Sequence, residues 1–340
     1  MIQEFRIKNY LSFRDEVVLS FEATKDTTFE ECQVVNVTPK VRLLRFALIY
    51  GANASGKSNL LNAMDFLRGF WFDKKSDIDE KTGVVPFLLD TETPNESSEF
   101  NIKFFVGDKR YWYVLVLDDK QVIKENLYVY NSVQPSLVFG RELDGTASLI
   151  KLNASLVKAN ATIVEQLNVK CLSNMSFFAA RNQVNCSLAY IDEVRDWMKN
   201  NMMPIIEPGT RMFEYAGKQM EKNAELKAYI LDFVHKADYN ITDVYTEREK
   251  VPIPDFVKAS IMEDKDISEK AKEKVLADNA LERLRTDFQH TVKNKRGEEN
   301  YRLPNSLQSE GTKRTFGIEA AIYEAIKTNG ILPIDEIESS

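Results

Sequence analysis

Residues 51–58 (GANASGKS) form a complete G-x-x-x-x-G-K-[ST] pattern. The glycines of such a loop let the backbone curl, so that successive N–H groups point inward at phosphate oxygens, and the following helix adds its positive N-terminal end. Lys57 then reaches the β- and γ-phosphates as a catalytic contact, and the Ser58 hydroxyl ligates Mg²⁺. The pattern therefore predicts a site for ATP and Mg²⁺. The remaining nucleotide contacts that we expect from this loop are Asn53, Ala54, Ser55, Gly56 and Asn59.

Two adjacent acids, Asp335 and Glu336, follow the short apolar run of residues 331–334 (ILPI). A strand that ends in two acids can place one carboxylate on Mg²⁺ and the other where it polarises the attacking water. We therefore expect Asp335 to bind the metal and Glu336 to act as the catalytic base. Pro333 is unusual in this position, because proline removes a backbone donor from what should be a central strand.

Residues 309–311 (SEG) precede a helix expected over residues 316–327, which leads directly into the strand with the two acids. A serine at this position can simply cap the helix N-terminus. Residues 309–311 also lie about 25 residues before the acids, at the place in the chain where ABC ATPases carry their signature loop. In that reading Ser309 and Gly311 contact the γ-phosphate of a nucleotide held by a second subunit.

The elements around these residues indicate an α/β fold. Residues 1–22 alternate like two strands with a turn at 14–16, and the apolar run 46–50 suits a strand buried on both faces of a parallel sheet. A helix is expected over residues 58–70 because its apolar residues follow helical spacing. Residues 99–130 read as an antiparallel meander with turns at 107–108 and 118–119.

The middle of the chain is expected to be mainly helical. Helices are predicted over residues 160–168, 188–200 and 211–236, a short strand over 241–247, and a charged helix that is capped at Asp266 and ends near Phe288. The predicted organisation is an N-terminal part of an ATPase head at 1–150, a helical insertion or arm at 151–290, and a C-terminal part of the head at 291–340. The expected fold is thus a mixed sheet with an antiparallel meander and an inserted helical subdomain.

Composition narrows the class of protein. The 340 residues carry a net charge of −7, so any nucleic-acid contact would need a local groove or a partner. Three widely spaced cysteines favour reduced thiols, and two histidines nearly exclude histidine-based metal sites or a Ser-His-Asp triad. The N-terminus lacks an apolar stretch of signal-peptide length, and no apolar run spans a membrane. We expect a cytoplasmic protein.

The motifs GANASGKSNLL, SEGTKR and LPIDEIESS together resemble the bacterial ABC/SMC-related ATPases of phage-defence and abortive-infection systems, such as RloA/AbiL-like proteins and the ATPase part of OLD-family nucleases. The opening IKNYLSF is similar to the first strands of RecF and SMC heads. The resemblance implies an ATP-dependent head dimer, with ATP between the P-loop of one subunit and residues 309–311 of the other. It also implies an effector partner of nuclease type.

This sequence departs from the family pattern in two places. Glu310 stands where the signature loop usually has glycine, and the chain ends four residues after Glu336, before the D-loop and switch histidine of such heads. We therefore expect the 340-residue chain alone to bind ATP weakly at best and to hydrolyse essentially none.

The function that we favour is that of a defence ATPase whose nucleotide state controls an effector. Two alternative functions stand beside it. One is a RecF/SMC-like DNA repair ATPase that grips DNA directly. The acidic charge and the lack of long heptad arms favour the defence ATPase over it. The other is a P-loop GTPase or small-molecule kinase. It is disfavoured because Asn294-Lys295 is followed by Arg-Gly rather than by a guanine-recognition motif.

Overall fold

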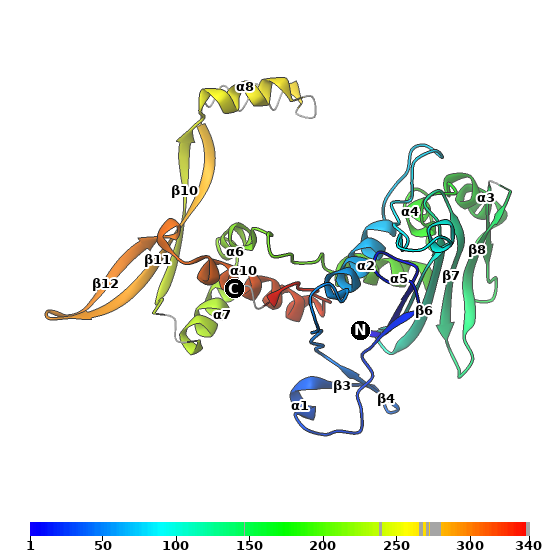
Figure 1. Cartoon of the computed structure of the whole chain (residues 1–340), viewed down its shortest axis with the longest axis horizontal. Coiled ribbons are helices and arrows are strands. Elements are labelled where there is room, and N and C mark those ends of the chain that lie inside the picture. The colour runs from blue at the N-terminus through cyan, green and yellow to red at the C-terminus, as the bar shows by residue number, and fades with distance from the viewer. Residues whose placement is uncertain (146, 238–239, 265–267, 270–271, 273–279, 338–340) are drawn as a thin grey trace. The chain divides into compact units, whose positions relative to one another are not determined.

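A computed structural model of the chain describes residues 1–145, 147–237, 240–264, 268–269, 272 and 280–337. The chain divides into two compact units. The first comprises Met1–Ile206 with Thr328–Asp335, and the second comprises Glu207–Lys327 with Glu336–Ser340. Figure 1 colours their elements along the chain. Among the described residues, no helix has the length and apolar character needed to cross a bilayer.

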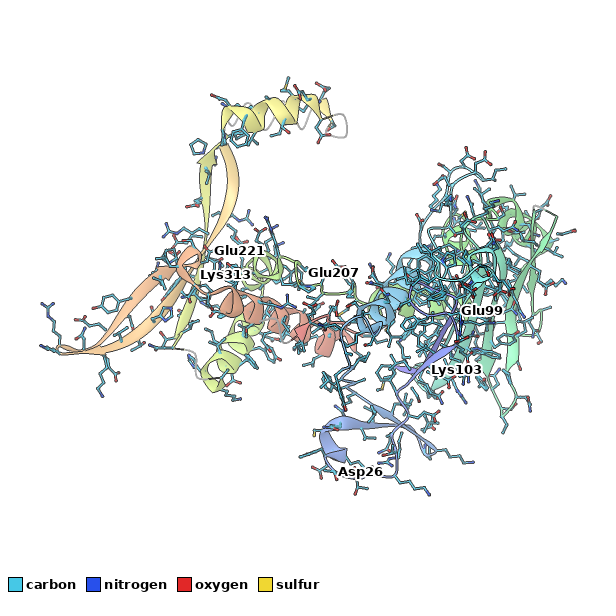
Figure 2. All side chains as sticks on the ribbon, viewed as in Figure 1. Asp26, Glu99, Lys103, Glu207, Glu221 and Lys313 are labelled. Atoms are coloured by element: carbon cyan, nitrogen blue, oxygen red, sulfur yellow. The ribbon has the colours of Figure 1, made fainter. Side chains whose placement is uncertain are left out.

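The first unit is built on a seven-stranded sheet whose neighbouring strands are all antiparallel (Figure 1). The expected meander is confirmed: three strands hydrogen-bond in sequence, and two further strands extend it. Lys103 in this sheet, labelled in Figure 2, forms an ion pair with Glu4 of the neighbouring strand at 2.9 Å. In spatial order the strands are β2 (Val17–Ser20), β1 (Ile2–Lys8), β5 (Ser98–Val106), β6 (Lys109–Leu117), β7 (Val122–Tyr130), β8 (Ser136–Asp144) and β9 (Ala147–Leu152).

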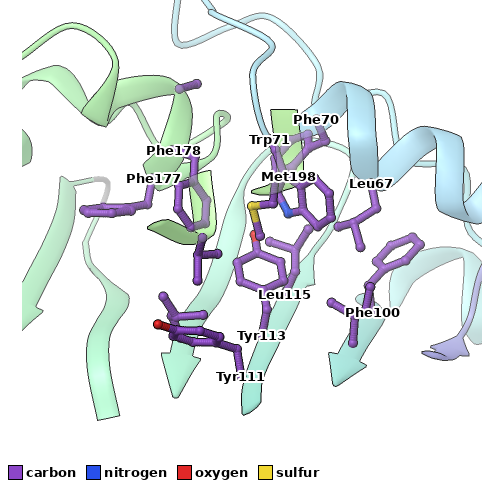
Figure 3. Packing of buried hydrophobic residues seen from close by; sticks show 14 of the residues in the cluster. Leu67, Phe70, Trp71, Phe100, Tyr111, Tyr113, Leu115, Phe177, Phe178 and Met198 are labelled. Atoms are coloured by element: carbon purple, nitrogen blue, oxygen red, sulfur yellow. The ribbon is translucent and has the colours of Figure 1, made fainter. Parts of the chain in front are cut away.

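One face of this sheet carries the larger hydrophobic core. Alternate residues of β6 (Tyr111, Tyr113, Leu115) are fully buried, as strand periodicity requires. Leu67 and Trp71, at the C-terminal end of α2, pack onto the same face (Figure 3). The helices of this unit are α1 (Glu30–Gln33), α2 (Lys57–Phe70), α3 (Ala161–Lys170), α4 (Phe177–Arg181) and α5 (Ile191–Asn201), with a 3₁₀ turn at Thr93–Asn95 and a small hairpin of β3 (Val34–Thr38) and β4 (Val41–Leu44).

The expected buried strand at residues 46–50 is wrong. The segment belongs to no strand, and Phe46, Leu48 and Tyr50 are 62%, 62% and 87% exposed, whereas Ile49 packs against the core. A central strand needs hydrogen-bonding neighbours on both edges. No other segment of the described chain provides one here, so the run stays unpaired.

The segment that carries Asp335 pairs with residues 202–206. Two parallel bridges join Met202 to Ile331 and Ile206 to Ile334. The Ile206 N–H donates to the carbonyl of Pro333 at 3.0 Å. Pro333 therefore takes part in this pairing only as an acceptor, and the missing N–H of proline costs no hydrogen bond here. This explains how Pro333 is accommodated.

The second unit combines helices with a three-stranded antiparallel sheet in the order β10, β11, β12 (Figure 1). A second hydrophobic cluster holds it together, with Phe288 and Phe316 fully buried and edge-to-face at 5.0 Å. Its elements are α6 (Met212–Met220), α7 (Ala224–Lys236), β10 (Asp243–Pro252), α8 (Asp255–Glu263), β11 (Ala280–Asn294), β12 (Gly297–Pro304), a 3₁₀ turn (Asn305–Leu307) and α10 (Glu310–Thr328).

The charged helix predicted to reach Phe288 is wrong over its last part, because residues 280–288 belong to β11. Its expected cap, Asp266, lies outside the described residues. The run of leucine, glutamate and arginine favours a helix locally. β11 instead pairs with β10 on one edge and β12 on the other, and it buries Thr286 and Phe288. These tertiary contacts outweigh the weak helix propensity.

Candidate nucleotide site

Residues 51–58 form a tight loop that runs directly into α2, as the sequence predicted. Gly56 has φ +93° and precedes the first helical residue, Lys57, while Ala54 also has a positive φ of 62°. The loop is mostly exposed, and the first N–H groups of α2 lack partners within the helix. The N-terminal end of a 14-residue helix therefore faces an open, curled backbone, which is the arrangement that binds phosphate.

The Lys57 side chain folds over this loop. Its ammonium donates to the carbonyl of Gly51 at 2.9 Å and to that of Ala52 at 3.0 Å. These contacts hold the positive charge above the curled backbone. An anion bound by the loop would lie next to the ammonium and form a stronger, charge-assisted hydrogen bond with it.

The other predicted nucleotide contacts of the loop lie around the same curl. Ser58 and Asn59 occupy the first turn of α2 and are half-buried. Asn53, Ala54 and Ser55 form the exposed tip. The structure thus brings together all the loop residues that the sequence singled out.

A turn between β1 and β2 supports the loop from one side, and sequence patterns assigned it no role. Tyr10 and Phe13 exchange backbone hydrogen bonds of 2.9 and 2.8 Å. A Cβ atom at Gly56 would lie 2.9 Å from the Ser12 hydroxyl and 3.0 Å from the Phe13 ring. Glycine is therefore required at position 56 both for its φ and for this close approach.

Two residues of this turn connect it to the rest of the first unit. The Asn9 side chain is buried, donates to the carbonyl of Thr93 at 2.8 Å and accepts from the N–H of Phe87 at 3.0 Å. Tyr10 packs against α2 through Phe66, with ring centroids 5.6 Å apart, and burial raises the pKa of its hydroxyl to about 12. The local signal in the sequence was Asn9 itself, since asparagine favours turns and tolerates the positive φ of 53° that it adopts here.

Asp335 belongs to the first unit with the loop. Its N–H donates to the carbonyl of Ile206 at 2.9 Å, and the neighbouring N–H of Ile205 donates to Asp65 of α2 at 3.4 Å. The acidic end of residues 331–335 is therefore tied, through residues 205 and 206, to the helix that follows the loop.

The remaining predicted site residues lie in the second unit. Glu336 has a positive φ of 47°, and its carbonyl accepts from Arg314 at 3.1 Å. The Ser309 hydroxyl accepts from the Thr312 N–H at 3.0 Å, so it caps α10. Gly311 lies in the first turn of that helix, where its carbonyl accepts from Thr315 at 3.0 Å. The capping role of Ser309, one of two readings of the sequence, is present.

One family model matches residues 46–151, which is fewer than half of the 340 residues. Its description is "AAA domain, putative AbiEii toxin, Type IV TA system". The matched region spans the phosphate loop and the antiparallel meander, and the match supports a P-loop ATPase domain of AAA/ABC type. No curated protein matches the chain.

Proposed function

We propose that this protein is an ABC/SMC-type ATPase that binds ATP-Mg²⁺ and whose nucleotide state controls an effector in bacterial anti-phage defence. The observation that supports it most is the loop before α2, where Lys57 Nζ lies 2.9 Å from the Gly51 carbonyl beside the open helix N-terminus. The loop amides and Lys57 would hold the β- and γ-phosphates.

The residues present fit Mg²⁺. This ion takes oxygen ligands and usually binds through one or two carboxylates together with the substrate's phosphates. Ser58 and Asp335 offer a hydroxyl and a carboxylate. In the described part of the chain, no group of three or more histidine, cysteine or acidic side chains is placed to hold a metal, so the nucleotide would complete the coordination. Bound there, Mg²⁺ neutralises charge on the phosphates.

The backbone of residues 332 and 334 and that of residues 46–50, all in the first unit, suit this function. The backbone groups of residues 331, 333 and 335 form hydrogen bonds with residues 201–206. In an extended segment alternate residues face opposite sides, so the backbone N–H and C=O groups of Leu332 and Ile334 face away from residues 201–206. Residues 46–50, which lead into the loop, have no backbone partner among the described residues. Pairing of these two segments would place Asp335 beside the loop.

Hydrolysis would then depend on Glu336, the predicted base that polarises the attacking water. Ser309 and Gly311 would contact the γ-phosphate held by a second copy, which makes the active form a head dimer. The family description, with its abortive-infection toxin and toxin–antitoxin system, supports the defence context and an effector partner, for which we propose a nuclease. Such a protein would act in the cytoplasm.

Lys57→Ala tests the nucleotide site. We expect calorimetry to show ATP binding to the parent protein and none to the variant at millimolar nucleotide, because the phosphates lose the lysine contact. Lys40→Ala, at an exposed lysine of the β3–β4 turn, is the matched control and should bind like the parent. Parent-like affinity in Lys57→Ala would refute the proposal.

Glu336→Gln tests hydrolysis in the native assembly, purified with its partners. The amide keeps the shape of the side chain but cannot accept the proton from water, so ATP should stay bound and dimers should accumulate. Phosphate release at the parent rate would show that Glu336 is not the base.

A further inference from the structure

The face of the large sheet that lies opposite the core has an apolar, aromatic centre. An antiparallel sheet normally presents polar residues on its solvent side. Here the residues that alternate with the buried ones on β6 and β7 include large apolar side chains, all half-buried. We call this set the aromatic face: Trp112, Val114, Val116, Tyr128 and Tyr130.

The register of the strands places these side chains side by side. Trp112 is the cross-strand partner of Tyr128, and their rings stack at 4.8 Å between centroids with 24° between planes. Lys103 lies across from Trp112 on β5, with its ammonium 6.0 Å from the indole centroid. Arg110 lies over Tyr130 at 4.4 Å. In both rows a cation of one strand thus lies next to a ring of the neighbouring strand.

Basic residues outnumber acids around the aromatic face. On β1 and on β5 to β9 the same side carries six cations, namely Arg6, Lys8, Lys103, Arg110, Lys124 and Lys151. Four carboxylates lie among them: Glu4, Glu99 (labelled in Figure 2), Glu142 and Asp144. The difference, six minus four, is +2 on this face, in a chain whose net charge is −7.

Two of these cations, Arg110 and Lys124, form no direct ion pair among the described residues, although Glu142 of β8 is the cross-strand partner of Lys124. Glu4 pairs with Arg6 and Lys103, and Glu99 pairs with Lys8. Within the described ranges, no carboxylate lies within ion-pair distance of Arg110 or Lys124, and the Nε of Arg110 is buried with no hydrogen-bond partner. The face therefore offers two cations without a direct ion pair beside the half-buried, stacked rings of Trp112 and Tyr128.

We propose that the aromatic face, with Arg110 and Lys124, binds single-stranded nucleic acid. Proteins that bind such strands combine a basic surface for the phosphates with aromatic side chains on which bases stack. Duplex DNA fits less well, because its bases are stacked internally and a seven-stranded sheet is too wide to enter a groove. This activity is separate from the proposed ATP site, and neither depends on the other.

Trp112 supplies a direct readout. Trp71 and Trp197 are buried, at 0% and 6% exposure, so only Trp112 can touch a ligand on this surface. We would titrate a 20-nucleotide oligo-dT into Lys57→Ala protein, in which the phosphate loop no longer competes for the strand. We expect quenching of tryptophan fluorescence at low salt, with an affinity that falls as salt rises.

Variants locate the contact. Trp112→Ala should weaken binding, measured by anisotropy of a labelled strand, by about 5-fold or more through loss of base stacking. Arg110→Gln and Lys124→Gln should each weaken binding and reduce the slope of log affinity against log salt by about 0.7. Lys40→Gln, on the exposed β3–β4 turn, is the matched charge control and should change neither.

The proposal is overturned by several results. One is the absence of quenching and of anisotropy change at low salt. Another is parent-like affinity in both Arg110→Gln and Lys124→Gln, which would place any binding elsewhere. Equal or tighter binding of a 20-base-pair duplex would indicate a duplex reader, and displacement of the strand by equimolar poly-glutamate would indicate a surface for an acidic polypeptide. Loss of ATP binding in Lys57→Ala has no bearing on this test.

Discussion

Glu125 and Arg141 form an ion pair inside the large sheet, with 3.1 Å between Arg141 Nη1 and Glu125 Oε2 and no exposure of either side chain. They are cross-strand partners on β7 and β8. Every remaining polar group of the pair is used. Glu125 also accepts from Tyr113, Ser176 and the N–H of Phe177, and Arg141 donates to Ser148 and to the carbonyls of Leu172, Ser173 and Met175. The pair thereby ties the segment before α4 to the sheet.

Arg141→Met should destabilise the first unit by about 3–5 kcal/mol, because it leaves the Glu125 carboxylate buried without its partner. Urea unfolding followed by tryptophan fluorescence measures this, since all three tryptophans lie in that unit. The neighbouring Glu142→Gln is the control, because Glu142 is 61% exposed and should change stability by less than about 0.5 kcal/mol. A loss below about 1 kcal/mol in Arg141→Met would mean that the buried pair is dispensable.

Gly56→Ala should lower both ATP affinity and stability. The new methyl would meet Ser12 and Phe13 at about 3 Å, and alanine is strained at φ +93°. We expect at least a tenfold weaker affinity by calorimetry and a loss of about 1–3 kcal/mol. Gly69→Ala is the matched control in the same helix, because nothing lies within 4 Å of its Cβ position. That variant should gain about 0.5–1 kcal/mol and bind ATP normally; equal behaviour of the two variants would contradict the role of the β1–β2 turn.

Ser309 can be tested for its two roles separately. Ser309→Ala should cost about 1 kcal/mol through the lost cap on Thr312, whereas Ser309→Asp should keep the cap and the stability. If Ser309 also contacts the γ-phosphate of a second copy, the aspartate would repel it. ATP-driven dimerisation, measured by light scattering in Glu336→Gln protein, should then weaken at least tenfold. Normal dimerisation of the aspartate variant would leave capping as the sole role of Ser309.

Glu4 should make the first unit sensitive to strong acid. Hydrogen bonds from Arg6, the larger influence, and from Lys103 lower the pKa of this carboxyl from 4.5 to about 2. Because the folded pKa is the lower one, the stabilisation is complete above pH 4.5 and is lost as the pH falls through about 2. Glu4→Gln should therefore show a shallower loss of urea stability between pH 4.5 and 2 than the parent. Identical slopes would show that Glu4 contributes nothing to the acid transition.

Local sequence was sufficient to predict several features of this protein. The phosphate loop, its entry into α2 and the cap on α10 depend on residues within a few positions of one another, so glycine, serine and lysine at fixed spacing were sufficient to predict them. The meander of β5, β6 and β7 was also predictable from the sequence, because the alternation of apolar and polar residues and the short turns define the register of a hairpin.

Long-range pairing was decided only by the tertiary structure. Residues 46–50 read as a buried strand, yet burial depends on a neighbouring strand that the segment cannot specify alone, and it remains unpaired among the described residues. Residues 280–288 read as a helix, yet pairing with β10, and with β12 at residues 287 and 288, makes them a strand. The close approach of Ser12 and Phe13 to Gly56 likewise arises from residues far apart in the chain. Local propensities of a few tenths of a kcal/mol per residue do not decide such contacts; the packing and hydrogen bonds between distant segments do.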